Sequence, residues 1–145
     1  MNVDLHSHST VSDGALGPEA LVARARSRGV DVLALTDHDE LGGLEAARGA
    51  AREAGIRFVD GVEISVTWRG ASVHVVGLAI DPAHPDLRHG LESVRGGRLA
   101  RARRIAADLA RIGIEGTLEG ALRHAAENPA MVGRSHFAQI GRAHV

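Results

Sequence analysis

The sequence predicts an α/β fold built from parallel strands joined by helices. Apolar runs and amphipathic helical segments alternate along the first half of the chain. The run at residues 30–35 is almost continuously apolar, which is typical of a strand covered on both faces. The strand–helix–strand order indicates crossover connections, so we expect a largely parallel sheet or barrel.

The first elements have clear boundaries. We expect a short strand at residues 2–6 and then a helix with Pro18 in its first turn and Gly29 at its end. Proline fits the first helical position because its missing N–H has no helical partner there, and glycine readily adopts the left-handed conformation that ends many helices. The apolar strand at 30–35 follows.

The same pattern then repeats. A second helix has apolar residues at helical spacing from Leu44 to Ala51 and ends at Gly55. A third strand is expected from residue 56 to residue 65, and a turn at 68–70 leads into a fourth strand at 72–78.

The character of the chain changes near residue 83, where we place a boundary between subdomains. A long amphipathic helix is expected through residues 99–112, ending at Gly113. A shorter helix follows, with Thr117 as its cap and Asn128-Pro129 at its end.

Composition excludes several classes of protein. The chain has 145 residues, of which 44% are hydrophobic, enough for one modest domain with a core. A net charge of -1 gives no sign of a nucleic-acid-binding or membrane-binding surface. No apolar run reaches the roughly 20 residues of a membrane helix, and no signal-peptide pattern opens the chain. We therefore expect a cytoplasmic protein and infer no obligate protein partner.

Imidazole and carboxylate side chains gather where the expected strands end. They are His6, His8 and Asp13 after the first strand, Asp37, His38 and Asp39 after the second, and Glu63 in the third. The carboxyl ends of parallel strands meet at one edge of a sheet or barrel, where such folds place their sites. The chain has no cysteine, so the available ligands are nitrogen and oxygen, which suit Mn, Fe or Zn. The set is too large for one tetrahedral ion, so a cluster bridged by a carboxylate such as Glu63 is expected.

These residues also have interpretations without a metal. An isolated His6-x-His8 is as often one packed and one surface histidine as a ligand pair. His74 lies in an apolar strand and could be a hydrogen-bonded core histidine, but beside the other candidates we favour a ligand. Glu63 could be an exposed edge charge, although its apolar neighbours favour burial. Asp37 or Asp39 could cap the next helix, and we expect this of at least one of them.

Other polar residues are expected on the surface. His84, His89 and His124 lie in a polar loop or on a helix face. We interpret the arginines of the long helix as a solvated face, with recruitment of phosphate as the less favoured alternative. These arginines are Arg95, Arg98, Arg101, Arg103 and Arg104.

Taken together, the motifs resemble those of the PHP (polymerase and histidinol phosphatase) family. They are His6-x-His8 with Ser12-Asp13-Gly14, Thr36-Asp37-His38-Asp39, Gly61-Val62-Glu63 and His74, and they cover residues 1 to about 80. The later stretch Arg134-Ser135-His136-Phe137-Ala138 is similar to bacterial members that act on 3′,5′-nucleotide bisphosphates, relatives of which trim RNA 5′ ends.

The resemblance implies the N-terminal part of a distorted (β/α)7 barrel followed by a small helical insertion. It also implies a site for three divalent ions, Mn in the first place and Fe or Zn as alternatives, with Glu63 bridging two of them. The residues that match the family's metal ligands are His6, His8, Asp13, His38, Glu63, His74 and His136. Of these, Asp13, His38 and Glu63 form the implied catalytic set, and Arg134 is an implied phosphate contact.

The reaction implied by the resemblance is hydrolysis of a phosphomonoester, the 3′-phosphate of a 3′,5′-nucleotide bisphosphate. A metal-bridging hydroxide would attack phosphorus in line with the leaving oxygen. A 5′–3′ exoribonuclease or oligonucleotide phosphodiesterase acting on a short RNA 5′ end is the alternative within the family. A non-catalytic PHP module is the alternative outside enzymes.

The chain departs from the family in length. Members run to nearly twice as many residues, and their last motifs, a further His and an Asp-x-His, have no counterpart in this sequence. We therefore expect a truncated barrel that is inactive by itself, with residues 1–82 as its first strands and helices and 83–139 as the insertion and the return to the barrel. The tail 140–145 breaks the apolar helical pattern and resembles a translated sequencing adapter, so we expect it to be non-native.

Overall fold

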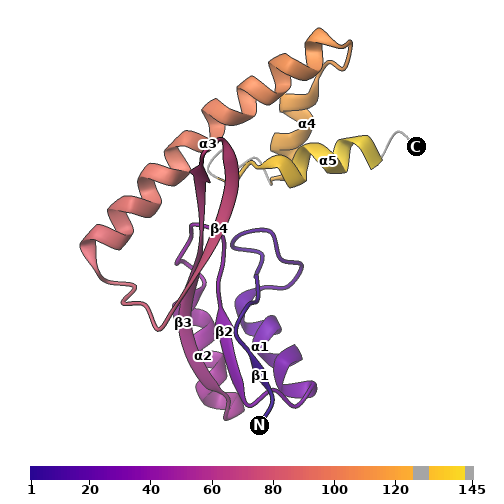
Figure 1. Cartoon of the computed structure of the whole chain (residues 1–145). Helices are drawn as coiled ribbons and strands as arrows, with labels where there is room; N and C mark the ends of the chain where they lie inside the picture. The colour runs from indigo at the N-terminus through magenta and orange to yellow at the C-terminus, as the bar shows by residue number, and fades with distance from the viewer. Residues whose placement is uncertain (126–130, 143–145) are drawn as a thin grey trace. The chain divides into compact units, whose positions relative to one another are not determined.

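The computed structural model describes residues 1–125 and 131–142, and the chain divides into two compact units, Met1–Leu91 and Glu92–Val145 (Figure 1). The strands are β1 (Val3–Asp4), β2 (Val32–Leu35), β3 (Arg57–Trp68) and β4 (Ala71–Leu78). The helices are α1 (Pro18–Ser27), α2 (Leu44–Ala54), α3 (Pro85–Arg111), α4 (Thr117–His124) and α5 (Arg134–Arg142). The boundary expected near residue 83 lies just before α3, whereas the division between the units falls inside that helix.

The first unit contains one four-stranded sheet in the order β1-β2-β3-β4. β1 pairs with β2 and β2 with β3 in parallel, and β3 pairs with β4 in antiparallel fashion. Of the residues of β3, only the first four pair with β2. The β3–β4 hairpin therefore continues past the parallel part of the sheet (Figure 1). The α/β fold with parallel strands joined by helices is thus confirmed.

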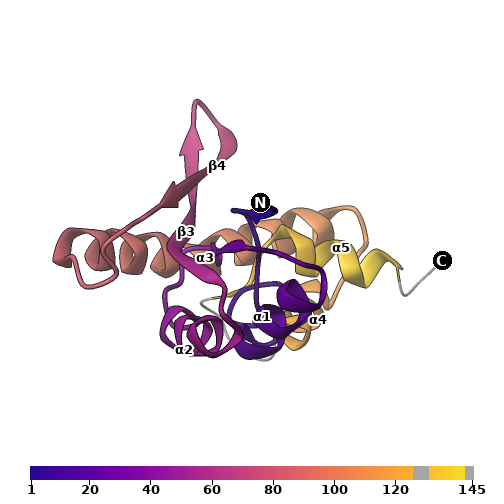
Figure 2. The same ribbon diagram turned by 90° about the horizontal axis from the view of Figure 1, so that it is seen from below.

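The core of the first unit lies between β2 and the two crossover helices. α1 and α2 lie on the same side of the parallel strands (Figure 2), and all four residues of β2 are buried. Leu33 and Leu35 of β2 pack with Val22 of α1 and Leu44 of α2. α1 begins at Pro18, and Gly55 ends α2 with a φ of 67°, as the sequence predicts.

The first strand is shorter than predicted. Regular pairing with β2 covers only Val3 and Asp4, so His6 and His8 lie beyond the strand. The chain still runs beside β2, but the Ser7 side chain donates to the carbonyl of Ala34, and Thr36 N donates to the carbonyl of Ser7. The Ser7 hydroxyl thus takes the place of a backbone N–H at the carbonyl of Ala34, which is why the regular strand pairing stops early.

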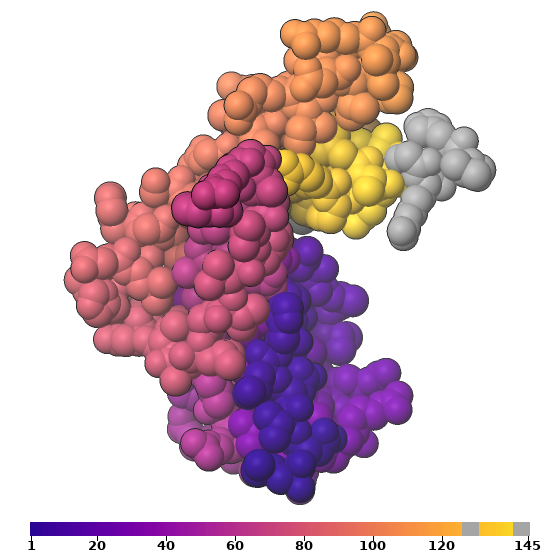
Figure 3. All heavy atoms as spheres, viewed as in Figure 1, coloured from indigo at the N-terminus to yellow at the C-terminus, as the bar shows by residue number. Residues whose placement is uncertain are grey.

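The outer strands of the sheet are uncovered on part of their surface. Figure 3 shows the N-terminal residues, in indigo, open on the viewed face. On the hairpin, Val66 and Val73 lie opposite each other, and both are exposed, as are Trp68 and Val75. In the described part of the chain the sheet therefore ends in two open edges, consistent with part of a barrel rather than a closed one.

The second unit has a small core of its own. Its buried residues are Ala102 of α3, Ala121 of α4, Ala125 just after α4, and Met131 and Val132 before α5. Phe137 and Ile140 of α5 pack against them. Gly116, not Thr117, is the N-cap of α4, and no side chain caps that helix, so the predicted Thr117 cap is wrong. The expected helix end at Asn128-Pro129 lies outside the described residues.

The start of the tail does not break the last helix. α5 continues to Arg142, and Ile140 packs into the small core, against Gly120 of α4. The predicted break in the helical pattern at residue 140 is therefore wrong. Across the described residues, no helix is both long and apolar enough to cross a membrane.

Candidate metal centre

Six of the predicted site residues come together in the first unit. They reach one place from separate parts of the chain: His6 and His8 beyond β1, Asp13 in the next loop, His38 after β2, Glu63 in β3 and His74 in β4. Three overlapping groups each place one ligand atom per residue within 4.8 Å of the others. The groups are His6–His8–Glu63, His8–Asp13–His38 and His38–Glu63–His74.

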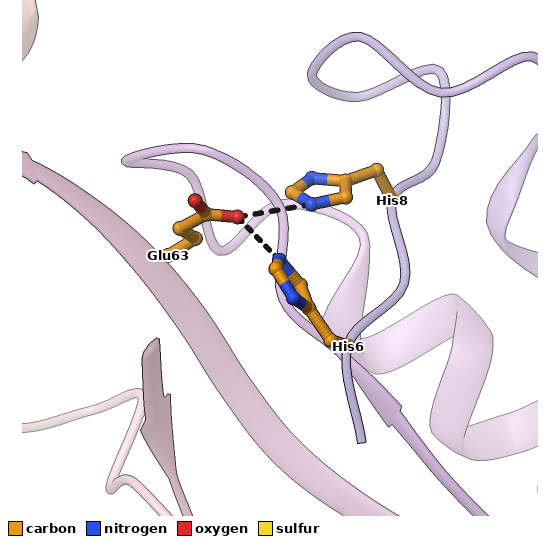
Figure 4. A group of neighbouring side chains, drawn as sticks. All are labelled: His6, His8 and Glu63. Atoms are coloured by element: carbon orange, nitrogen blue, oxygen red, sulfur yellow. Dashed lines mark hydrogen bonds and ion pairs between the residues drawn. The ribbon is translucent and has the colours of Figure 1, made fainter. Parts of the chain in front are cut away.

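Glu63 lies at the centre of the cluster, and its side chain is only 7% exposed. One carboxylate oxygen, Oε2, is 2.6 Å from Nε2 of His6 and 3.0 Å from Nε2 of His8 (Figure 4). The other, Oε1, is 2.9 Å from Nδ1 of His74. The two oxygens thus face different imidazoles, as a carboxylate that bridges two cations must do.

Asp13 and His38 form the other side of the cluster. The Asp13 carboxylate lies 3.6 Å from Nδ1 of His8 and 3.7 Å from Nε2 of His38. The His8 and His38 rings are stacked, with centroids 4.6 Å apart. These gaps between nitrogen and oxygen are longer than ordinary hydrogen bonds, so the groups converge on common points rather than bonding to one another.

The cluster shifts the pKa values of two of its members. Burial lowers the pKa of His38 below its ordinary value, although the carboxylates of Glu63 and Asp13 oppose the shift. Burial by itself would raise the pKa of Glu63, but the hydrogen bond with His6 and the nearby imidazoles outweigh it, so that pKa is lowered. At neutral pH, His38 is neutral and Glu63 is ionised, which are the forms that bind metals.

One buried nitrogen in the cluster favours a cation. Nδ1 of His38 is buried and has no hydrogen-bond partner among the described residues. It faces Oε2 of Glu63 at 3.9 Å, too far for a hydrogen bond. A buried imidazole nitrogen without a partner is costly, and a metal ion bound at its lone pair would remove that cost. The residues therefore fit a divalent metal, with donors that are all nitrogen and oxygen.

The two carboxylates that flank His38 hold the backbone of the site. Asp37 accepts hydrogen bonds from Ser9 and Ser12, and Asp39 accepts one from Ser65 N at 2.7 Å. Asp39 has a positive φ of 55°, which is rare for a residue with a side chain, and its N–H donates to the carbonyl of Glu63. Gly43 is the N-cap of α2, and no side chain caps that helix, so the prediction that one of these aspartates caps it is wrong.

Glu63 and His74 differ in how exposed they are to solvent. The burial predicted for Glu63 is confirmed, since the whole residue is 5% exposed. His74 is more open than a residue inside an apolar strand should be, with 45% of its side chain exposed. The reason is its place in β4, which pairs only with β3 in the described part of the chain.

The remaining candidates belong to the second unit or the surface. His136 is buried, and its Nδ1 accepts a hydrogen bond from Gly133 N at 3.0 Å. Arg134 is exposed at the start of α5. The roles assigned to His136 and Arg134 stay predictions. The three histidines expected on the surface, His84, His89 and His124, are exposed as predicted.

One arginine of the long helix is not part of a solvated face. Arg98 is only 6% exposed, and its Nη1 donates to the carbonyl of Met131 at 3.4 Å. Arg103 and Arg104 are exposed, whereas Arg95 and Arg101 are half-buried. The prediction of a fully solvated face is therefore wrong for Arg98, because a long guanidinium side chain can reach a distant carbonyl of its own unit.

The fold and the imidazole–carboxylate cluster define an α/β protein whose clustered nitrogen and oxygen donors suit divalent metal ions. A family model for the PHP domain matches residues 4–94, which include all six clustered side chains. The chain belongs to the PHP domain family.

Several known proteins are similar to this chain. A 3′,5′-nucleoside bisphosphate phosphatase from Chromobacterium violaceum is 53% identical over 138 residues, which are 95% of this chain and 48% of the relative. A 5′-3′ exoribonuclease from Haemophilus influenzae is 45% identical over 143 residues, 96% of this chain and 51% of the relative.

A solved structure of an amidohydrolase from Chromobacterium violaceum, with bound sulfate and no metal, superposes with a TM-score of 0.89 at 50% identity. It is matched over 100% of this chain and 51% of its own. The chain thus spans about half the length of the curated relatives it matches, consistent with part of a PHP barrel.

Proposed function

We propose that these residues carry much of the site of a metal-dependent phosphoesterase, which hydrolyses the 3′-phosphate of a 3′,5′-nucleotide bisphosphate. The observation that carries the proposal is the clustering of four imidazoles with the carboxylates of Asp13 and Glu63 in three overlapping groups. The 53% identity to a 3′,5′-nucleoside bisphosphate phosphatase supports the choice of substrate.

The donor set suggests how divalent ions would be held. His6, His8 and one oxygen of Glu63 would hold one ion, and His74 with the other oxygen of Glu63 would hold a second. Asp13 would bind a third, and His38 would serve either this ion through Nε2, which faces Asp13, or the second ion through Nδ1, which faces Glu63. Mn fits this mixture of nitrogen and oxygen donors, as do Fe and Zn.

A count of donor atoms shows what this arrangement lacks. A neutral imidazole has one lone pair, so each of the four histidines can serve one ion only. With the oxygens of Asp13 and Glu63 there are four nitrogens and four oxygens, which is few for three ions that each prefer four to six ligands. Water and substrate oxygens would supply the remainder, together with residues of a longer chain.

Bound divalent ions would supply a nucleophile from water at neutral pH and would offset the charge of the phosphoryl oxygens. The chain's own residues would do the positioning. Glu63, held ionised, keeps His6 and His8 turned toward one of its oxygens and His74 toward the other. His38, held neutral by burial, keeps its lone pair free for a cation instead of a proton.

We further propose that the 145-residue chain binds metal but does not turn over substrate. Its relatives are about twice as long, and its donor set is short of ligands. Activity would belong to a longer protein that includes these residues.

The second candidate is a 5′–3′ exoribonuclease that acts on a short RNA 5′ end. It is favoured by the 45% identity to an enzyme of that name. Both candidates need the same metal centre, whereas a non-catalytic module would have no reason to keep all six donors in place. The substrates therefore decide between the candidates.

The test measures phosphate or nucleotide release by the longer protein loaded with Mn²⁺. The substrates are 3′-phosphoadenosine 5′-phosphate, a 5′-phosphorylated oligoribonucleotide and histidinol phosphate. The proposal expects the bisphosphate to be hydrolysed fastest and His8→Ala to abolish turnover. Preference for the oligoribonucleotide would favour the second candidate, and full activity in His8→Ala would overturn the metal mechanism.

A further inference from the structure

Asp37 is a buried carboxylate that none of the three ligand groups among the described residues includes. It follows β2, and it is 1% exposed. Its Oδ1 accepts hydrogen bonds from Ser9 N at 2.7 Å and from the Ser12 hydroxyl at 2.6 Å. Its Oδ2 accepts one from the Ser9 hydroxyl at 2.6 Å. All three of these short bonds go to one loop.

The loop that Asp37 holds carries Asp13. Inside the loop, Ser12 N and Gly14 N both donate to the carbonyl of Ser9, at 3.0 and 2.9 Å. The loop is therefore a compact turn fastened to Asp37 at both Ser9 and Ser12. Because Asp13 lies between Ser12 and Gly14, its position follows from these bonds.

Asp37 also touches the other side of the cluster. Its backbone carbonyl accepts a hydrogen bond from Glu63 N at 3.2 Å, and its neighbour His38 forms a parallel bridge with Glu63. One residue thus connects the Asp13 loop, the end of β2 and β3. Its side chain makes the connection to the Asp13 loop, and its main chain makes the connection to β3.

We propose that Asp37 is a positioning residue whose carboxylate, acting through Ser9 and Ser12, holds Asp13 and His8 at the metal-binding geometry. This inference rests on the proposed metal-dependent function. A carboxylate suits this place because it is an acceptor only, and it meets three donors here. An amide has one acceptor oxygen, so the bond with the Ser9 hydroxyl would have to reverse its direction, and the other two bonds would weaken because a neutral oxygen replaces a carboxylate oxygen.

A structural role alone would make different predictions. If Asp37 only stabilised the fold, its loss would lower stability without changing the affinity of the folded protein for metal. If it positions the loop, metal affinity falls in protein that is still folded. Removal of a residue that does not bind the metal but orients its ligands typically changes the metal affinity by about 10- to 100-fold.

The experiment measures Mn²⁺ affinity of the 145-residue chain by calorimetry in wild type, Asp37→Asn and Ser9→Ala. Ser9→Ala removes only one of the bonds to Asp37, and it keeps the test open if Asp37→Asn fails to fold. The control is Asp60→Asn, because Asp60 is a half-buried carboxylate of β3 that is paired with Arg48 at 2.6 Å, outside the cluster.

The expected result is a fall of about 10- to 100-fold in Mn²⁺ affinity for Asp37→Asn, a smaller fall for Ser9→Ala, and wild-type affinity for Asp60→Asn. Amide exchange supplies a second readout. Gly14 N and Ser12 N should lose protection in Asp37→Asn, while Ile56 N, which donates to the carbonyl of Ala51, should keep it.

Two outcomes overturn different statements. Wild-type Mn²⁺ affinity and wild-type loop protection in the folded variants would overturn the role of Asp37. Absence of Mn²⁺ binding by the folded wild type would overturn the proposed metal centre itself.

Discussion

Gly14 should be irreplaceable because of the backbone it touches. An added Cβ at Gly14 would lie 2.1 Å from the carbonyl oxygen of His8 and 2.4 Å from its carbonyl carbon, whereas ordinary van der Waals contact begins near 3.4 Å. Both neighbours are main-chain atoms, so no side chain can swing away. In Gly14→Ala the two backbone segments must separate by about 1 Å, at a cost of about 1–3 kcal/mol in the free energy of unfolding.

The displacement falls on Asp13, which precedes Gly14, and on His8. Misplacing a reacting group by about 1 Å can cost on the order of 100-fold in rate. We therefore expect Gly14→Ala to weaken Mn²⁺ binding by calorimetry by at least about 10-fold. The matched control is Gly49→Ala in α2, where an added Cβ meets nothing within 4 Å. Wild-type Mn²⁺ affinity in a folded Gly14→Ala would refute the steric reasoning.

Three further predictions concern charge, pH and packing. Glu63→Gln removes the anion that faces three imidazoles at 3.0 Å or less, so Mn²⁺ affinity measured by calorimetry should fall by more than about 100-fold while circular dichroism stays unchanged. Because burial lowers the pKa of His38, the unfolded chain takes up that proton at a higher pH than the folded chain. As pH falls through and below about 6.5, the free energy of unfolding of metal-free wild type, measured in urea, should therefore fall relative to that of His38→Gln. The difference should grow by no more than about 1.4 kcal/mol per pH unit. An equal pH dependence in both proteins would contradict the lowered pKa. Leu33→Ala, at a core position 1% exposed, should cost about 2–5 kcal/mol in the same assay, and a cost below about 1 kcal/mol would contradict the described core.

Local patterns in the sequence were sufficient for the parallel strands and the helix ends. The apolar run before Thr36 becomes the buried strand β2, and Pro18 and Gly55 begin and end helices where proline and glycine are favoured. The burial of Glu63 was also predictable, because the apolar residues on either side of it indicate a buried part of the strand.

Contacts between distant residues were not predictable in the same way. Asp37 resembles a helix cap in the sequence, but its partner Ser9 is 28 residues away and is brought near only by the pairing along β2. The partner of Arg98 is the carbonyl of Met131, 33 residues away. Periodicity reports which face of an element is apolar, and it carries no information about which polar groups meet after folding.

The length of β1 was mispredicted for a related reason. His6 and His8 continue the alternating pattern of a strand, yet pairing stops at Asp4 because the Ser7 side chain bonds to Ala34. A serine that competes with the backbone for a carbonyl is a local effect, but its partner is again distant in the chain.

The central claim, that the six clustered side chains form a metal centre, is tested most directly by counting bound ions. The 145-residue chain is stripped of metal, titrated with Mn²⁺ and examined by native mass spectrometry. Convergence of three donor groups predicts more than one Mn²⁺ per folded chain, with the count reduced in Glu63→Gln. Less than one ion per folded wild-type chain at saturating Mn²⁺ would contradict the account.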